Sequence, residues 1–122
     1  MKIDCLVLGD YQTNEAVWDE TDKFGYIYNK ADNNLYAGLA LITSQSINHY
    51  AINFDALDGN VPDVDTMFTD NLKHRFVAEQ QKAMAGEIGA GNDVAHIIGG
   101  TGIKLLPNEG IKVSFAVLAS TS

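Results

Sequence analysis

The chain has 122 residues and a hydrophobic fraction of 46%, which is typical of one globular domain and excludes a disordered segment. Eight basic and sixteen acidic residues give a net charge of −8, so a nucleic-acid backbone or an anionic membrane surface would repel it. No segment is long and apolar enough to cross a membrane. We therefore expect neither a nucleic-acid partner nor a membrane partner.

The first residues predict a buried strand. Ile3 to Leu8 is a short apolar run that ends at Gly9-Asp10, and it has neither the length nor the cleavage site of a signal peptide. Cys5 is the only cysteine, so no internal disulfide can form, and we expect it to be a small buried apolar residue. A start within a strand and an end at Ala119-Ser120-Thr121-Ser122 suit a domain excised from a longer protein.

Aromatic and β-branched residues predict a hairpin in the first half of the chain. Phe24 to Asn29 and Leu35 to Thr43 predict its strands, and Lys30 to Asn34 has the composition of the turn between them. Gly38 predicts a bulge or a close backbone approach within the second strand. Before the hairpin, Glu15 to Glu20 fits either a strand or a loop.

The middle of the chain predicts a strand and then the one helix. Ile47 to Phe54 alternates, with its core face made of Tyr50, Ile52 and Phe54. Thr66 to Met84 predicts the helix, with Thr69 as N-cap and Asp70 in the first turn. Its apolar stripe, which includes one polar step, comprises Leu72, Phe76, Val77, Gln80 and Met84. Gly86, Gly89 and Gly91 would end this helix and begin a loop.

The last third predicts further strands and completes the fold class. The strands are Asn92 to Ile98, Ile103 to Leu106 and Ile111 to Leu118, separated by turns at Gly99 to Gly102 and Pro107 to Gly110. Short strands divided by turn signals predict a mainly β protein, an antiparallel β-sandwich of jelly-roll or Ig-like type with one helix between strands. We expect a single domain over residues 1–122, and not a doubly wound sheet, because strands and helices do not alternate.

Motifs for catalysis are missing from the sequence. The histidines His49, His74 and His96 lack the spacing of a helical metal site, although a dispersed three-histidine site is an alternative. No G-x-S-x-G motif surrounds any serine. The segment Gly99 to Gly102 lacks the Lys-Ser/Thr of a phosphate-binding loop, and a strand is predicted after it. The sequence therefore predicts a protein that is not an enzyme and has no catalytic residues.

An acidic loop over residues 55–65 is the candidate metal site. Asp55, Asp58, Asp63 and Asp65 offer the oxygen ligands that Ca²⁺ prefers. Pro62 interrupts the spacing of an EF-hand, and a plain solvated loop is the alternative reading. A second acidic group lies earlier in the chain, and its members are Asp19, Glu20 and Asp22.

Six aromatic residues are candidates for a carbohydrate platform. They are Trp18, Phe24, Tyr26, Tyr28, Tyr36 and Tyr50. Flat rings on one face of a sheet suit a sugar surface, whereas ordinary cross-strand packing of the hairpin is the alternative.

Several segments together point to a known family. They are Met67–Lys73, Asn92–Ile98, Gly100–Gly102 and Leu106–Ala119, with Gly9-Asp10-Tyr11, Asn14 and Trp18-Asp19 upstream. These segments resemble the accessory β domain that follows the catalytic domain in secreted subtilisin-like proteases of Bacteroidetes-type bacteria. The chain departs from that pattern at Asn108, where the family often has Gly, and around Asp65 to Met67, where Asp-Gly is common. It also has none of the protease triad.

The resemblance implies a function without catalysis. It implies a secreted or cell-surface accessory domain that packs against a neighbouring domain of the same protein. The hairpin face from Phe24 to Thr43 is the candidate docking surface, because it is rich in aromatic and aliphatic residues. The alternative is a β module that binds carbohydrate or Ca²⁺. Apart from that Ca²⁺, no cofactor is expected, and the oligomeric state stays open.

Overall fold

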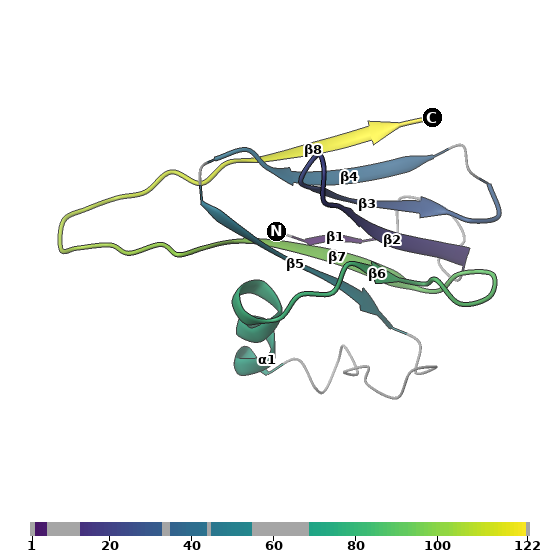
Figure 1. Cartoon of the computed structure of the whole chain (residues 1–122), viewed down its shortest axis with the longest axis horizontal. Helices are drawn as coiled ribbons and strands as arrows, with labels where there is room; N and C mark the ends of the chain where they lie inside the picture. Colours follow the sequence, from purple (N-terminus) through teal and green to yellow (C-terminus); the bar gives the residue numbers. More distant parts are fainter. Residues whose placement is uncertain (1, 5–12, 33–34, 44, 55–68, 122) are drawn as a thin grey trace.

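The fold is known from a computed structural model that describes residues 2–4, 13–32, 35–43, 45–54 and 69–121 (Figure 1). Its strands form a three-stranded sheet in the order β1-β7-β5 and a five-stranded sheet in the order β6-β2-β3-β4-β8. All ladders between these strands are antiparallel. The strands are β1 (Lys2–Asp4), β2 (Asn14–Asp19), β3 (Phe24–Asn29), β4 (Tyr36–Leu41), β5 (Ser46–Asn53), β6 (Met84–Ala85), β7 (Val94–Thr101) and β8 (Phe115–Ser120). With one short helix, α1 (Asp70–His74), extended by the π-helical turn η4 (Arg75–Glu79), this confirms the predicted mainly antiparallel β-sandwich.

The core between the two sheets is built from small and branched apolar side chains. One cluster joins Trp18, Leu39, Leu41 and Ile98, with Phe115 packed against it. The other comprises Ala16, Ile27, Ala37, Ala51, Ala85 and Val94. Burial of apolar surface, at about 25 cal/mol per Å², stabilises this contact between the sheets. Because side chains alternate along a strand, the residues between the buried positions of β3 face outward.

The helix covers the opposite face of the three-stranded sheet. Phe76 packs with Ile52, Ala95 and Ile97, and Tyr50, Phe54, Leu72 and Val77 lie around them. The predicted core face of β5 is therefore correct, but the strand is also buried on its other face, where His49 and Ala51 meet the five-stranded sheet. Figure 1 shows the helix and the five-stranded sheet on opposite sides of β5 and β7.

The helix is shorter than the predicted Thr66 to Met84. Thr69 is its N-cap, as predicted, because its Oγ1 accepts from the Leu72 N–H at 3.2 Å. The helix ends at Glu79, and Gln80 has extended backbone angles. Residues 66–68 lie outside the described part of the chain.

Side-chain and sheet hydrogen bonds explain why the helix stops early. The Asn48 side-chain amide donates to the carbonyls of Phe76 and Gln80, at 2.9 Å each. Farther on, the Ala83 carbonyl accepts from the Trp18 N–H at 2.8 Å. The predicted helical position Met84 lies in β6 beside β2 instead. Backbone carbonyls that would bond within a longer helix therefore accept hydrogen bonds from groups on the sheets instead.

Strand β7 continues through the glycines that were predicted to form a turn. At Gly99, a Cβ atom would lie 2.3 Å from the Val77 carbonyl oxygen, so the missing side chain lets the π-helical turn approach the sheet. Of the predicted turn, only Gly102 has a positive φ, at 71°. The prediction of a turn from Gly99 to Gly102 was therefore wrong for its first three residues.

An extended arm replaces the predicted strand from Ile103 to Leu106. This arm, residues 102–114, projects beyond the two sheets between β7 and β8 (Figure 1). Its tip is the predicted turn from Pro107 to Gly110, with a 3.0 Å hydrogen bond from the Glu109 N–H to the Leu106 carbonyl. The last strand accordingly starts at Phe115 instead of the predicted Ile111.

The remaining predictions concern the N-terminal half. Glu15 to Glu20, left open between strand and loop, lies in β2 up to Asp19. Gly38 shows no bulge, because the register of β3 and β4 is regular, but the Phe24 ring lies 3.4 Å from the position of a Cβ there. Cys5 and the rest of the predicted strand beyond Asp4 lie outside the described residues. Among those described, no helix is long and apolar enough to cross a membrane.

Candidate functional site

Four aromatic side chains share the outer face of the five-stranded sheet. Phe24, Tyr26 and Tyr28 alternate along β3 with buried residues, and Tyr36 of β4 pairs directly with Tyr28. The rings of Tyr28 and Tyr36 are stacked, with centroids 5.6 Å apart and planes at 20°. Phe24 and Tyr26 lie 5.4 Å apart. We call Phe24, Tyr26, Tyr28 and Tyr36 the aromatic face.

An open cleft lies on this face. It has a volume of about 500 Å³ and runs from the β2–β3 turn across to β8. Gly38 stands between Tyr26 and Leu118 in the sheet register, so it adds no side chain of its own there, and the Phe24 ring lies over it. The carboxylates of Asp19 and Asp22 border the cleft beside the rings. Aromatic surface and charged acceptors therefore meet at one accessible site.

The phenols of Tyr26 and Tyr28 remain hydrogen-bond donors at neutral pH. Burial raises the pKa of Tyr28, and the neighbouring charge of Glu15 raises it further. The Tyr28 hydroxyl donates to Glu15 Oε2 at 3.1 Å, and the same oxygen lies 3.3 Å from Lys30 Nζ. Burial likewise raises the pKa of Tyr26, with a smaller contribution from Asp19.

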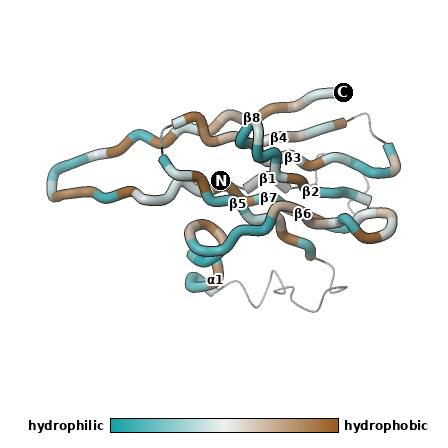
Figure 2. The backbone as a smooth tube through the Cα atoms, viewed as in Figure 1, coloured by the Kyte–Doolittle hydropathy of each residue, from teal (hydrophilic) through white to brown (hydrophobic). Residues whose placement is uncertain are grey.

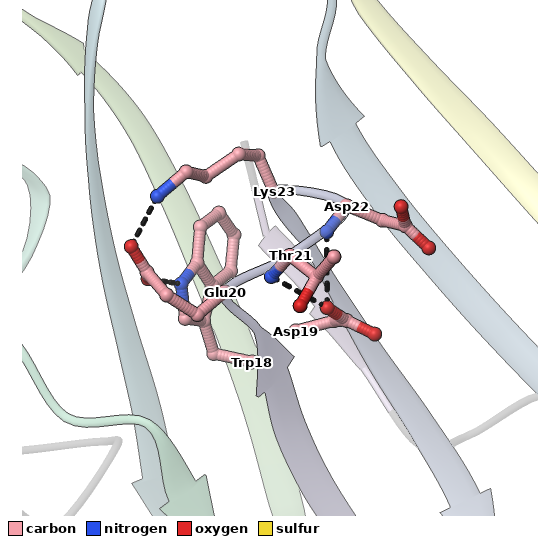
Figure 3. Close-up of polar contacts among 6 residues, drawn as sticks. All are labelled: Trp18, Asp19, Glu20, Thr21, Asp22 and Lys23. Atoms are coloured by element: carbon pink, nitrogen blue, oxygen red, sulfur yellow. Dashed lines mark hydrogen bonds and ion pairs between the residues drawn. The ribbon is translucent and has the colours of Figure 1, made fainter.

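The predicted acidic group Asp19, Glu20 and Asp22 forms the turn between β2 and β3 (Figure 3). Asp19 Oδ1 accepts from the backbone N–H groups of Thr21 and Asp22, at 2.8 and 3.0 Å. Glu20 accepts from the Trp18 indole at 2.7 Å and pairs with Lys23, whose hydrogen bond is the main cause that lowers the pKa of Glu20. In the described part of the chain, no three acidic, histidine or cysteine side chains converge as a metal site.

The calcium site predicted over residues 55–65 falls outside the part of the chain that the structure describes. Asp55, Asp58, Asp63 and Asp65 all lie outside the described residues. The structure therefore does not test them, and Ca²⁺ binding there stays a prediction.

Two of the three histidines meet, but in the core between the sheets. His49 stacks on Trp18 with ring centroids 4.2 Å apart and planes at 7°, and His96 meets both rings edge-on. His74 does not join this cluster. It is exposed on the helix, and its Nε2 lies 3.3 Å from Glu79 Oε1. The dispersed three-histidine site is therefore not formed.

His96 is fully buried, and within the described chain no hydrogen bond of good geometry reaches either ring nitrogen, although the Val17 backbone interacts with the ring. The pKa of His96 is lowered to about 4, mainly by burial and to a smaller extent by the charge of His49, while the Val17 backbone opposes the shift. Burial also lowers the pKa of His49. Both imidazoles are thus neutral near neutral pH and act as packing groups.

The structure divides the six predicted aromatic candidates. Trp18 is buried in the core, and Tyr50 stacks on Phe76 beneath the helix at 4.2 Å. The other four form the aromatic face. Leu118, which the sequence did not single out for a site, borders the cleft from β8.

No protein-family model matches the chain, and no curated protein or solved structure matches it either. The case for a function therefore rests on the residues and their arrangement.

Proposed function

We propose that this chain is a non-catalytic accessory domain of an exported protein and that its aromatic face binds carbohydrate. The observation that carries the carbohydrate proposal is the alignment of four aromatic rings beside an open cleft. The exported setting is what the resemblance of segments such as Asn92–Ile98 and Leu106–Ala119 implies. The hydropathy of the five-stranded sheet is mixed in this region (Figure 2), which suits a ligand that is part apolar and part polar.

A sugar ring matches this surface in both of its chemical aspects. One face of a pyranose presents C–H groups, which pack on flat aromatic rings such as Tyr26 and Tyr36. Its hydroxyl groups donate to carboxylates and accept from phenols. Asp19, which borders the cleft, provides such a carboxylate. Such pockets combine apolar surface with a few polar groups that fix the orientation of the ligand.

The charge of the site selects among carbohydrates. Asp19 and Asp22 border the cleft, and the whole chain has a net charge of −8. A polysaccharide rich in carboxylates or sulfates would be repelled. The proposed ligands are therefore neutral glycans or glycans with amino sugars.

Removing one ring from the aromatic face separates stacking from general hydrophobicity. Tyr26→Leu is expected to weaken binding to a neutral polysaccharide roughly tenfold, equivalent to about 1.4 kcal/mol, because Leu lacks a flat face. Tyr26→Phe keeps the ring and is expected to retain most of the affinity. Affinity electrophoresis in gels that contain a panel of neutral and amino polysaccharides measures both variants.

Ile88→Ala is the matched control, because Ile88 is 68% exposed and lies away from the aromatic face in the loop between β6 and β7. It is expected to migrate like the wild type in every gel. Migration of the wild type that no polysaccharide retards would refute carbohydrate binding on this face.

Deletion of the domain tests the accessory role. We expect the exported protein that contains it to lose stability or activity when residues 1–122 are removed, because a neighbouring domain would lose its packing partner. Thermal unfolding and activity of the parent protein, with and without the domain, measure the effect. An unchanged melting temperature together with unchanged activity would contradict the accessory role and leave carbohydrate binding to stand or fall separately.

A further inference from the structure

Among the described strands, β8 lies at an edge of the five-stranded sheet, beyond β4 and with no neighbour on its other side (Figure 1). The Ile42 N–H donates to the Ser114 carbonyl at 2.9 Å, in the same register as the ladder between β4 and β8. Because hydrogen-bonded pairs alternate in an antiparallel ladder, Ala116 and Leu118 direct their backbone groups to β4. Those of Phe115, Val117 and Ala119 consequently face the free edge.

This edge lacks the protection that strand edges commonly have. Charged residues, proline, bulges or very short length usually prevent one sheet from pairing with another. Residues 113–121 contain no charged residue and no proline, and Val117 and Leu118 are 60% and 50% exposed. Of the other described edge strands, β1 and β6 are short by comparison, at 3 and 2 residues. Strand β5 has 8 residues, but part of its outer edge is already bonded to Lys82, whose carbonyl accepts from the Ala51 N–H at 2.8 Å and whose N–H donates to the His49 carbonyl at 3.2 Å. The β8 edge is therefore the one suited to accept another strand.

The arm adds apolar surface and opposite charge beside that edge. Its two legs form no ladder with each other in the described chain, and its exposed apolar residues are Ile103, Leu105, Leu106 and Ile111. The arm contains two lysines and one glutamate and therefore has a net charge of +1. The whole chain has a net charge of −8, so the rest of the chain has a net charge of −9.

We propose that a second copy of this chain pairs with the β8 edge, so that the two β8 strands run antiparallel and the two five-stranded sheets become continuous. Identical strands can pair in this way about a two-fold axis, which closes the assembly at two copies. The partner is a second copy because this edge is uncharged in an otherwise acidic chain, and pairing it with itself brings no like charges together. This inference does not depend on carbohydrate binding.

Sedimentation velocity of the full chain over a wide range of concentration tests the proposal. We expect the wild type to reach the mass of a dimer as the concentration rises. Val117→Pro is expected to remain a monomer, because it removes a backbone N–H that faces the free edge, where proline is tolerated, and leaves the bonds to β4 intact. Circular dichroism shows whether that variant is folded.

A second variant keeps the test decisive if the proline disrupts the strand. Val117→Lys places a charge on the edge strand and is expected to weaken dimerisation at least tenfold. Ile88→Lys introduces the same charge at a position elsewhere that is 68% exposed, against 60% for Val117, and is expected to dimerise like the wild type. A wild type that stays monomeric at all concentrations overturns the proposal. A dimer that survives both substitutions at Val117 overturns it as well.

Discussion

Acidification from neutral pH to about pH 4 is expected to destabilise the domain by roughly 3 kcal/mol through His96 alone. In the unfolded chain the pKa of His96 is near the ordinary imidazole value of 6.5, and in the folded chain it is about 4. Between these values the unfolded state binds more protons, so stability falls as the pH falls. The contribution is fully present above pH 6.5 and is lost once the pH passes below the folded pKa.

Unfolding in urea, followed by fluorescence, measures this loss. Trp18 is the only tryptophan and stacks on His49, so its emission reports directly on the cluster. His96→Leu removes the titrating group and keeps an apolar side chain in the core, and its unfolding free energy is expected to change much less between neutral pH and about pH 4. His49 still contributes, since burial lowers its pKa too.

The control is His74→Gln, which removes an exposed histidine from the helix. It is expected to follow the pH dependence of the wild type. If His96→Leu instead retained the whole dependence, the acid sensitivity would come from other groups and the assignment to the buried cluster would be wrong.

Gly25→Ala is expected to destabilise the fold by about 3 kcal/mol, the upper range for overpacking a core. The added Cβ would lie 2.5 Å from Nδ1 and 2.7 Å from Cε1 of His96, closer than real Cβ atoms approach other atoms. His96 is fully buried, so its ring has no solvent-filled space to enter. Denaturant unfolding of the variant measures the cost.

Gly110→Ala provides the matched comparison, because no atom lies within 4 Å of a Cβ at that position. It is expected to leave stability unchanged within about 0.5 kcal/mol. The double variant Gly25→Ala with His96→Ala should be more stable than the sum of the single effects predicts, because the smaller side chain removes the clash. Equal stability of Gly25→Ala and Gly110→Ala would show that the His96 ring can move aside.

Local patterns were sufficient to predict the hairpin. Phe24 to Asn29 was predicted with the bounds that β3 has, because alternating aromatic residues end at a polar turn. Asn29 Oδ1 accepts from the N–H groups of Ala31 and Asp32, at 2.9 and 3.0 Å, which is the local turn bonding expected of this residue type. Where such short-range bonding decides the conformation, sequence alone suffices.

Long-range packing decided the features that the sequence did not predict. The helix ends at Glu79 because Asn48, on a distant strand, bonds to its last carbonyls. Gly99 lies within β7 because the backbone at Val77 approaches it closely. Nothing in the neighbouring residues distinguishes such a glycine from one in a turn, so the prediction of a turn was the reasonable one and was wrong.

The aromatic face was predictable in part. Alternation already placed Phe24, Tyr26 and Tyr28 on one side of a strand. Whether Trp18 joined them depended on the register of β2 against β3, in which Val17 and not Trp18 pairs with Tyr26. The stacking of Trp18 on His49 required in addition the packing of one sheet on the other, which no local pattern reveals.

The pairing of β8 with β4 has a consequence for the order in which the strands join during folding. Strand β8 pairs only with β4 in the described sheet, and Gly38 meets Leu118 across 80 positions of sequence. Contacts so distant in sequence form slowly, because a long loop must close before they give any stabilisation. We therefore expect β8 to join the sheet late in folding, after β3 and β4 have formed their hairpin. Until then the edge of β4 is the place where a newly made chain is most exposed to mispairing.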